Sequence, residues 1–356
     1  MNNLINIIPN PDPLPVAAGW FQFLSHFTYY LHLISVGIMF TIAISMTVGY
    51  FKGKSDENWL AFGKDMAHLL PFTIAFAINL GVAPLLFIQV LYGNFFYTAS
   101  TLVGTNWILL VVILILGYYA AYWISFRESG KHGTKKYLGL FVSIVLAWTG
   151  FILVNVNTLM LRPSSWKGYF SHMGGFHLNT GDPTMLPRYT FYLFLLLAIG
   201  GLFIAVYSKF KYGKEKSKPW IAFGASLAGY SCFLTLPSFI YYMRILPHNI
   251  RGVFLTGDAI WTIVSVFCFF GLIITGYLSL QRRIIPASVV LGLNLVIFVI
   301  MRGKVRSLFL EPFSEKFSTT GANTQYLVMA LFLVTLAAGL ALIFWMLWKT
   351  HKELKS

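Results

Sequence analysis

The stretch FAINLGVAPLLFIQVLYGNFF, residues 76–96, runs for 21 residues without a charged side chain. An α-helix rises 1.5 Å per residue, so this stretch forms a helix about 30 Å long, which matches the hydrocarbon thickness of a bilayer. A run of this length and composition is typical of a transmembrane helix. It predicts that the chain is an integral membrane protein.

The rest of the chain repeats this pattern. Of its 356 residues, 57% are hydrophobic and only 10% are charged, whereas soluble domains carry about 25% charged residues. A water-soluble fold is therefore excluded. We expect an all-α, polytopic membrane helix bundle that forms a single domain over residues 1–356. About nine transmembrane helices are expected, at 21–50, 69–98, 106–126, 137–160, 189–208, 220–243, 258–280, 285–301 and 325–348.

The formal charge of +15 predicts topology rather than nucleic-acid binding, because the 26 Lys and Arg residues are scattered through the connections between spans. Sorting these connections alternately places 17 basic residues on one side and 9 on the other. Connections rich in Lys and Arg face the cytoplasm. We therefore expect the N-terminus outside, the C-terminus in the cytoplasm, and a multi-pass protein of the cell inner (cytoplasmic) membrane.

Two of the expected outer connections are long, 161–188 and 302–324, and a shorter one covers 244–257. The two long connections contain several aromatic residues. Aromatic residues are enriched in the cores of protein interfaces, although they are also typical of the belt at lipid head groups. We expect the outer face to bind a partner. The candidate aromatic residues in the two long connections are Trp166, Tyr169, Phe170, Phe176, Phe309 and Phe313.

Carboxylate side chains are missing from the interior of the expected spans: all 11 Asp and Glu residues lie in connections or at span ends. Intramembrane carboxylates usually mark proton relays and ion pathways. Their absence argues against a proton pump or a proton-coupled carrier. A transporter is further disfavoured because the sequence shows no internal repeat.

Neutral polar residues are most frequent in the second expected span, where Gln89, Tyr92 and Gly93 share one helical face. Polar donors beside aromatic rings suit a quinone head group, whose carbonyls need hydrogen-bond donors. The alternative is that such residues hydrogen-bond between helices and hold the bundle together. The candidates for binding a quinone or a haem propionate are Gln89, Asn94, Tyr92, Arg188 and Arg244.

Histidine is the residue best suited to redox chemistry here, because a neutral imidazole can ligate haem iron. His32 lies deepest in an expected span, and His26 precedes it by six residues, too far along the helix to share one haem. The alternative for His32 is a hydrogen-bonded core histidine. The haem-ligand candidates are His32, His26, His172, His177 and His248.

The two cysteines, Cys232 and Cys268, both lie in expected spans, and the chain contains no CxxC or CxxCH motif. Neither a disulfide framework nor a covalent c-type haem is encoded. We expect any c-type haem to be carried by a partner.

Several segments resemble subunit I of cytochrome bd quinol oxidase. FQFLSHFTYYLHLISVG, residues 21–37, is similar to that family's first helix, and its haem-ligating histidine matches His32. FAINLGVAPLLFIQVLYGNF, residues 76–95, resembles the second helix. The segments 155–168 and 186–193 resemble the end of the fourth helix, its loop and the start of the fifth. The resemblance covers the first five expected spans and implies a nine-helix fold with an external N-terminus.

The sequence departs from that family at residues that serve oxygen reduction. The glutamate of the family's second helix is matched by Gln89, and the two glutamates of its third helix have no counterpart. The histidine ligand of the fifth helix is matched by Phe191, and no Arg-x-Met pair occurs in the seventh span. The resemblance therefore implies a related scaffold that is not an oxygen reductase.

Residues 79–100 also resemble membrane subunits that accompany multihaem c-type cytochromes. We expect the membrane subunit of a respiratory quinol:cytochrome c oxidoreductase, using quinone or quinol and one b-type haem. Its partner would be a multihaem c-type cytochrome or another redox subunit on the outer face. The alternative is a haem-free anchor for an extracytoplasmic complex.

Overall fold

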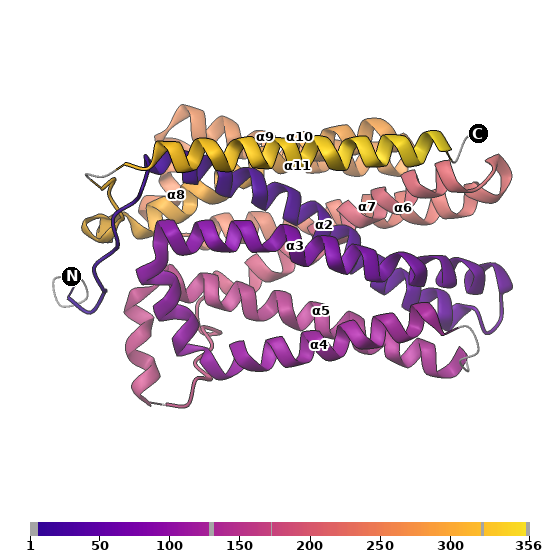
Figure 1. Ribbon diagram of the computed structural model, residues 1–356, viewed down its shortest axis with the longest axis horizontal. Helices are drawn as coiled ribbons and strands as arrows, with labels where there is room; N and C mark the ends of the chain where they lie inside the picture. The colour runs from indigo at the N-terminus through magenta and orange to yellow at the C-terminus, as the bar shows by residue number, and fades with distance from the viewer. Residues whose placement is uncertain (1–5, 128–131, 172, 322–323, 354–356) are drawn as a thin grey trace.

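The computed structural model describes residues 6–127, 132–171, 173–321 and 324–353, with the side chains of 132, 343, 347 and 350–353 excepted. Within these residues, nine helices are long and apolar enough to cross a membrane. The all-α polytopic architecture expected from the sequence is confirmed. The beginning of the described chain and the end of its last helix lie at opposite ends of the bundle (Figure 1).

The long helices follow one another in the order that the apolar runs predict. They are α2 (Ala18–Lys52), α3 (Glu57–Leu102), α4 (Gly104–Phe126), α5 (His132–Met160), α6 (Met185–Lys211), α7 (Lys214–Ile245), α9 (Ala259–Leu280), α10 (Ile284–Leu310) and α11 (Tyr326–Glu353). Longer connections join α5 to α6 and α10 to α11. The shorter elements are η1 (Pro163–Ser171), α8 (His248–Gly252), η2 (Val253–Gly257) and η3 (Glu311–Lys316).

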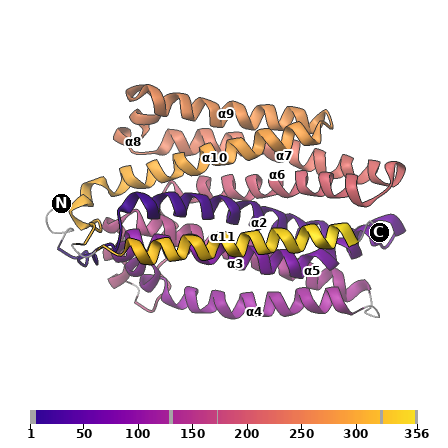
Figure 2. The same cartoon turned by 45° about the horizontal axis from the view of Figure 1, so that its top comes forward.

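Small residues allow the helices of the bundle to approach closely. A Cβ added at Gly49 of α2 would lie 2.5 Å from Gly63 Cα of α3, and one at Gly200 of α6 would lie 2.2 Å from the Thr41 side chain of α2. Glycine at such positions is the usual way for membrane helices to pack, because lipid offers no hydrophobic driving force between them. Figure 2 shows α2 between α3 and α6 at the centre of the bundle.

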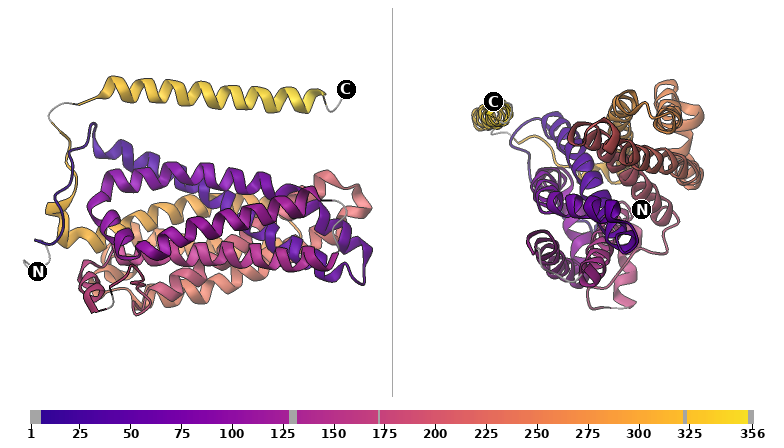
Figure 3. Two further views of the ribbon diagram at one scale, coloured as in Figure 1. Left: turned by 60° about the horizontal axis from the view of Figure 1, so that its bottom comes forward. Right: turned by 90° about the vertical axis from the view of Figure 1, so that its right-hand side faces the viewer.

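The helix α11 is the exception to this packing. It stands apart from the other helices (Figure 3), and none of its described side chains is buried. A short backbone pairing holds the segment that leads into α11: Leu14 N donates to Thr319 O at 2.7 Å, and Gly321 N donates to Leu14 O at 2.8 Å. The body of α11 is therefore exposed along its length, while the segment before it is fixed.

The end of α10 corrects one expectation from the sequence. Residues 302–310 continue the helix and do not begin a loop, so Arg302, Lys304 and Arg306 lie on a membrane-spanning helix. The sequence pattern ended the span at 301 because charged side chains lower hydropathy. In the structure these side chains turn inward and contact aromatic rings, so the helix continues.

Candidate functional site

A cavity of about 490 Å³ lies inside the bundle, enclosed by parts of α2, α3, α4, α5, α6, α7 and α10. Its volume falls within the range of about 300–1,000 Å³ of small-molecule and cofactor sites. Aliphatic and aromatic side chains form most of the wall. Its polar residues are Tyr29, His32, Thr149, Asn157, Arg188, Tyr189, Tyr192, Tyr242, Arg302 and Arg306. We call this space the large cavity.

His32 of α2 lines the large cavity, and its ring orientation is set by the neighbouring helix α3. Its Nδ1 lies 3.0 Å from the carbonyl oxygen of Ala77. A carbonyl can only accept, so Nδ1 carries the proton and Nε2 keeps its lone pair in the neutral ring. A hydrogen bond of this kind is what fixes the tautomer of metal-binding histidines.

Gly81 gives His32 the space that this arrangement needs. A Cβ added at Gly81 would lie 2.7 Å from Cε1 of the His32 ring, closer than side-chain carbons approach one another. Gly81 also lines the large cavity. The apolar run of the second span therefore contains a glycine at the point where the histidine of the first span lies against it.

Arginine side chains line the same cavity without a carboxylate partner. Arg302 lies over the Tyr29 ring, with 4.1 Å from Cζ to the ring centre, and its Nη2 donates to Asn157 Oδ1 at 3.3 Å. Nη2 of Arg188 donates to the Tyr242 hydroxyl at 2.8 Å. Among the described residues that line the cavity, none is Asp or Glu. The cavity therefore combines an apolar body with cationic groups, which suits an amphiphile with acidic groups.

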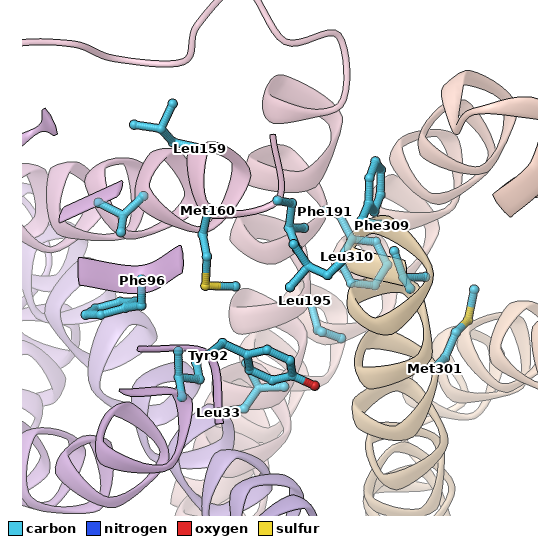
Figure 4. Close-up of a cluster of buried hydrophobic side chains, with 14 of the residues drawn as sticks. Leu33, Tyr92, Phe96, Leu159, Met160, Phe191, Leu195, Met301, Phe309 and Leu310 are labelled. Carbon is cyan, nitrogen blue, oxygen red and sulfur yellow. The ribbon is translucent and has the colours of Figure 1, made fainter. Parts of the chain in front are cut away.

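Phe191 occupies the position matched to the fifth-helix histidine of cytochrome bd oxidase subunit I. The fifth span therefore provides no second haem ligand at this position. The Phe191 ring is buried and packs against Phe298 of α10, with 4.8 Å between ring centres. Figure 4 shows Phe191 in an apolar cluster with Leu195, and Met301 on the neighbouring helix α10. Met301 lines the large cavity and is the one thioether there besides Met39. Sequence analysis did not single out either methionine.

A second, smaller cavity of about 200 Å³ lies between α2, α3, α9 and α10. We call it the small cavity. Its lining includes His26, Tyr92, Lys304 and Arg306, and Arg306 lines the large cavity as well. The backbone of α3 departs from helical geometry at Tyr92, with φ of −139° and ψ of 31°. Tyr92 is therefore turned toward α10, where its ring lies 5.4 Å from Cζ of Arg306.

The structure separates the haem-ligand candidates. His32 lines the large cavity and His26 the small one, so they do not face a common site. His177 is held in its loop, with Nε2 3.1 Å from Ser165 O, and His248 is exposed at the start of α8. Neither of these two lines a cavity described above. His172 lies outside the described residues.

The quinone candidates are separated in the same way. Asn94 uses its amide to donate to the carbonyl oxygens of Pro9 and Lys316, which is a structural role that joins α3 to the segments before α2 and α11. Gln89 lines neither cavity, and Arg244 is exposed and lines neither. Tyr92 lines the small cavity and Arg188 the large one.

Sequence analysis placed Arg302 and Arg306 in a loop and so did not predict their part in the cavities. The observation that points to them is their spacing of four residues, followed after Ser307 by the apolar residues Leu308, Phe309 and Leu310. Two cations on one helical face between apolar runs indicate side chains that face an internal site.

The connection 161–188 is folded against the bundle, which corrects part of the predicted binding surface. Trp166 is buried and donates from Nε1 to Leu159 O at 2.9 Å. Phe309 and Phe313 are buried as well. These three residues pack the protein itself. Phe170 and Phe176 are 75% and 61% exposed and remain available at the surface.

Taken together, the nine long helices and their internal cavities define a polytopic membrane protein with a cofactor-sized site inside the bundle. No family model and no curated protein sequence matches the chain. Among solved structures, the chain resembles the bd oxidase from Geobacillus thermodenitrificans, with a TM-score of 0.63 over 91% of this chain and 96% of that chain. Sequence identity is 11%. The protein therefore has the cytochrome bd oxidase fold, as the resemblance of its first five spans predicted.

Proposed function

We propose that the protein is the membrane subunit of a quinol:cytochrome c oxidoreductase that holds one b-type haem in the large cavity. The observation that supports this most is that His32 lines an apolar cavity of about 490 Å³ together with arginine side chains. The hydrogen bond from Nδ1 of His32 to Ala77 O leaves the lone pair on Nε2 for a metal ion. A haem bound there supplies one-electron transfer. His32 would ligate its iron, and Arg302 would neutralise a propionate.

The residues around the large cavity fit this group on chemical grounds. The imidazole is fixed by Ala77 O, the walls are apolar, and Arg302 and Arg188 have no carboxylate partner in the described part of the chain. A buried guanidinium without a counterion is costly, so an acidic ligand stabilises it. The apolar wall excludes water from the bound group, which favours a low dielectric around it.

Quinone chemistry is proposed for the same region of the bundle. Arg188 and the Tyr242 hydroxyl lie 2.8 Å apart and both line the large cavity. A quinone carbonyl can accept a hydrogen bond from either group. Of the five quinone candidates, Arg188 is the one whose surroundings best match this role.

An outer-face redox partner completes the proposal. The exposed rings of Phe170 and Phe176 lie on the loop 161–188, which is fixed to α4 by a hydrogen bond of 2.6 Å from Thr105 Oγ1 to Gly174 O. A fixed loop that exposes aromatic side chains is suited to binding another protein. We propose that this loop binds the multihaem cytochrome or other redox subunit that receives the electrons.

Oxygen reduction is not part of the proposed function. No Asp or Glu lines either cavity among the described residues, and Gln89 occupies the position matched to a glutamate. Reducing oxygen consumes protons, which need a relay of titratable groups inside the membrane. Quinol-dependent, cyanide-sensitive oxygen uptake by the isolated complex would contradict this part of the proposal.

The test of the proposed function is a pyridine haemochrome assay on the purified chain, with His32→Ala and His248→Ala as a matched pair. We expect one b-type haem per chain in the wild type and in His248→Ala, and loss of that haem in His32→Ala. A wild-type chain without haem would instead favour the anchor function, because the bond from His32 to Ala77 O would then serve to join α2 to α3.

A further inference from the structure

The small cavity contains a buried cation that no group of the protein neutralises. Arg306 is only 7% exposed, and the described residues give it no hydrogen bond and no ion pair, only the face of the Tyr92 ring. A guanidinium carries five N–H donors and stays charged. Burying a guanidinium without an acceptor costs free energy, so the cavity around Arg306 favours the binding of an anionic ligand.

The neighbours of Arg306 strengthen this indication. Lys304 and Ser25 line the small cavity with it and supply further donors, whereas the Ser307 hydroxyl donates to Gly303 O at 3.2 Å. None of the described lining residues is acidic. The Lys304 ammonium lies 5.5 Å from the centre of the Trp261 ring, so it is held near the cavity and not directed into bulk water. An arginine, a lysine and hydroxyl groups around a confined space are the donor set for an oxyanion.

His26 and Gly303 shape the space itself. His26 Nδ1 lies 2.6 Å from Gln22 O and therefore donates, so its Nε2 is the free nitrogen. That Nε2 lies 2.1 Å from the position that a Cβ on Gly303 would occupy. Glycine at 303 is thus what leaves His26 in place beside the cavity. Any side chain there must displace the imidazole.

We propose that the small cavity binds a phosphate group, either inorganic phosphate or the head group of an anionic phospholipid. Its volume of about 200 Å³ suits a head group and not a whole lipid. Ile300, which also lines the cavity, is 46% exposed on the outside of the helix bundle, so an acyl chain can continue from the cavity into lipid. The site adjoins the proposed haem site through Arg306, which lines both cavities, but Lys304 and His26 line only the small cavity, and Arg302 and Arg188 line only the large one.

Two measurements on the full-length purified chain distinguish the two sources. The first is equilibrium dialysis with radiolabelled inorganic phosphate. The second is native mass spectrometry of protein released from nanodiscs of phosphatidylcholine, with and without phosphatidylglycerol. Saturable binding of inorganic phosphate supports the free anion as the ligand. Retention of phosphatidylglycerol over phosphatidylcholine, without saturable phosphate binding, supports the lipid.

The matched variants are Gly303→Ala and Gly292→Ala, both on α10. A Cβ at Gly292 meets only the Tyr30 hydroxyl, at 3.6 Å, which is an ordinary contact. We expect Gly303→Ala to weaken phosphate binding at least tenfold and Gly292→Ala to bind within twofold of the wild type. Lys304→Gln, at a half-buried position, is expected to weaken binding similarly and serves if Gly303→Ala does not fold.

Two results would overturn the proposal. One is a wild-type chain that shows neither saturable phosphate binding nor a preference for phosphatidylglycerol. The other is binding by folded Gly303→Ala and Lys304→Gln that equals the wild type. Haem content, measured on the same samples, is expected to stay constant across these variants. The outcome therefore does not depend on whether the large cavity holds haem.

Discussion

The guanidinium of Arg302 on α10 lies 4.1 Å from the centre of the Tyr29 ring on α2. Tyr29 in turn donates its hydroxyl hydrogen to Tyr192 Oη of α6 at 3.1 Å. With Asn157 of α5, whose Oδ1 accepts from Arg302, four helices from distant parts of the chain meet around one cation. The charge is spread over an aromatic face and an amide oxygen, and its remaining donors are left for a ligand in the large cavity.

This arrangement predicts the effect of Arg302→Gln. The variant keeps a polar side chain but loses the charge, so we expect haem to dissociate at least tenfold more readily on dilution. Arg244→Gln is the matched control, because Arg244 is exposed and lines neither cavity. The measurement is haem retained per chain after gel filtration. Equal retention in both variants would contradict a role for Arg302 in binding the propionate.

Gly81→Ala tests the packing that orients His32. The added Cβ would lie 2.7 Å from His32 Cε1, so the ring must move and its bond to Ala77 O must lengthen. Overpacking of this kind costs about 1–3 kcal/mol. We expect a lower thermal midpoint and an altered haem absorption spectrum.

The control for Gly81→Ala is Gly150→Ala, at another glycine of the large cavity. Its Cβ would meet only Tyr189, at 3.8 Å, and we expect an unchanged spectrum. A wild-type spectrum in Gly81→Ala would show that His32 is not the iron ligand.

The outer loop offers a contrast between two aromatic residues four positions apart. Trp166→Ala removes a buried ring and its bond to Leu159 O, which we expect to cost about 3–5 kcal/mol of stability. Phe170→Ala changes a ring that is 75% exposed, so stability should change by less than about 0.5 kcal/mol.

The proposed redox partner is expected to respond to the exposed ring and not to the buried one. Phe170→Ala is expected to weaken copurification of this proposed partner while the bundle stays folded. Thermal unfolding in detergent and pull-down of the partner measure the two effects separately. If Phe170→Ala together with Phe176→Ala left copurification unchanged, another surface would have to bind the partner.

The topology is also testable. The basic residues number 17 on one set of connections and 9 on the other, so we expect the C-terminus in the cytoplasm. Alkaline phosphatase fused after Ser356 should be inactive, and a cytoplasmic fluorescent reporter at the same place should be bright. An active phosphatase and a dark fluorescent reporter would show that the bundle has the opposite orientation in the membrane.

The number and order of helices could be predicted from the sequence, because each apolar run is long enough to span a bilayer by itself. The end of α10 could not, since hydropathy treats Arg302 and Arg306 as solvent-exposed. What keeps them in the helix is contact with Tyr29 and Tyr92, residues more than 200 positions away. Long-range partners of this kind leave no local pattern.

For the same reason, only part of the candidate site could be predicted from the sequence. His32 could be selected by its depth in the first span, and it does line the large cavity. Its hydrogen bond to Ala77 O and the room made by Gly81 depend on how α2 packs against α3. Trp166 could not be assigned correctly, because aromatic residues in a loop look alike in sequence whether they cover the bundle or face outward.

The pairing of Leu14 with residues 319–321 has a consequence for the order of assembly. Leu14 precedes α2 in the chain and residues 319–321 follow α10, so the two can join only after all of these helices have been synthesised. Because α11 buries no described side chain against them, it enters the membrane on its own hydrophobicity. Protection of the Leu14 segment from protease would therefore report that the chain as far as Gly321 is in place.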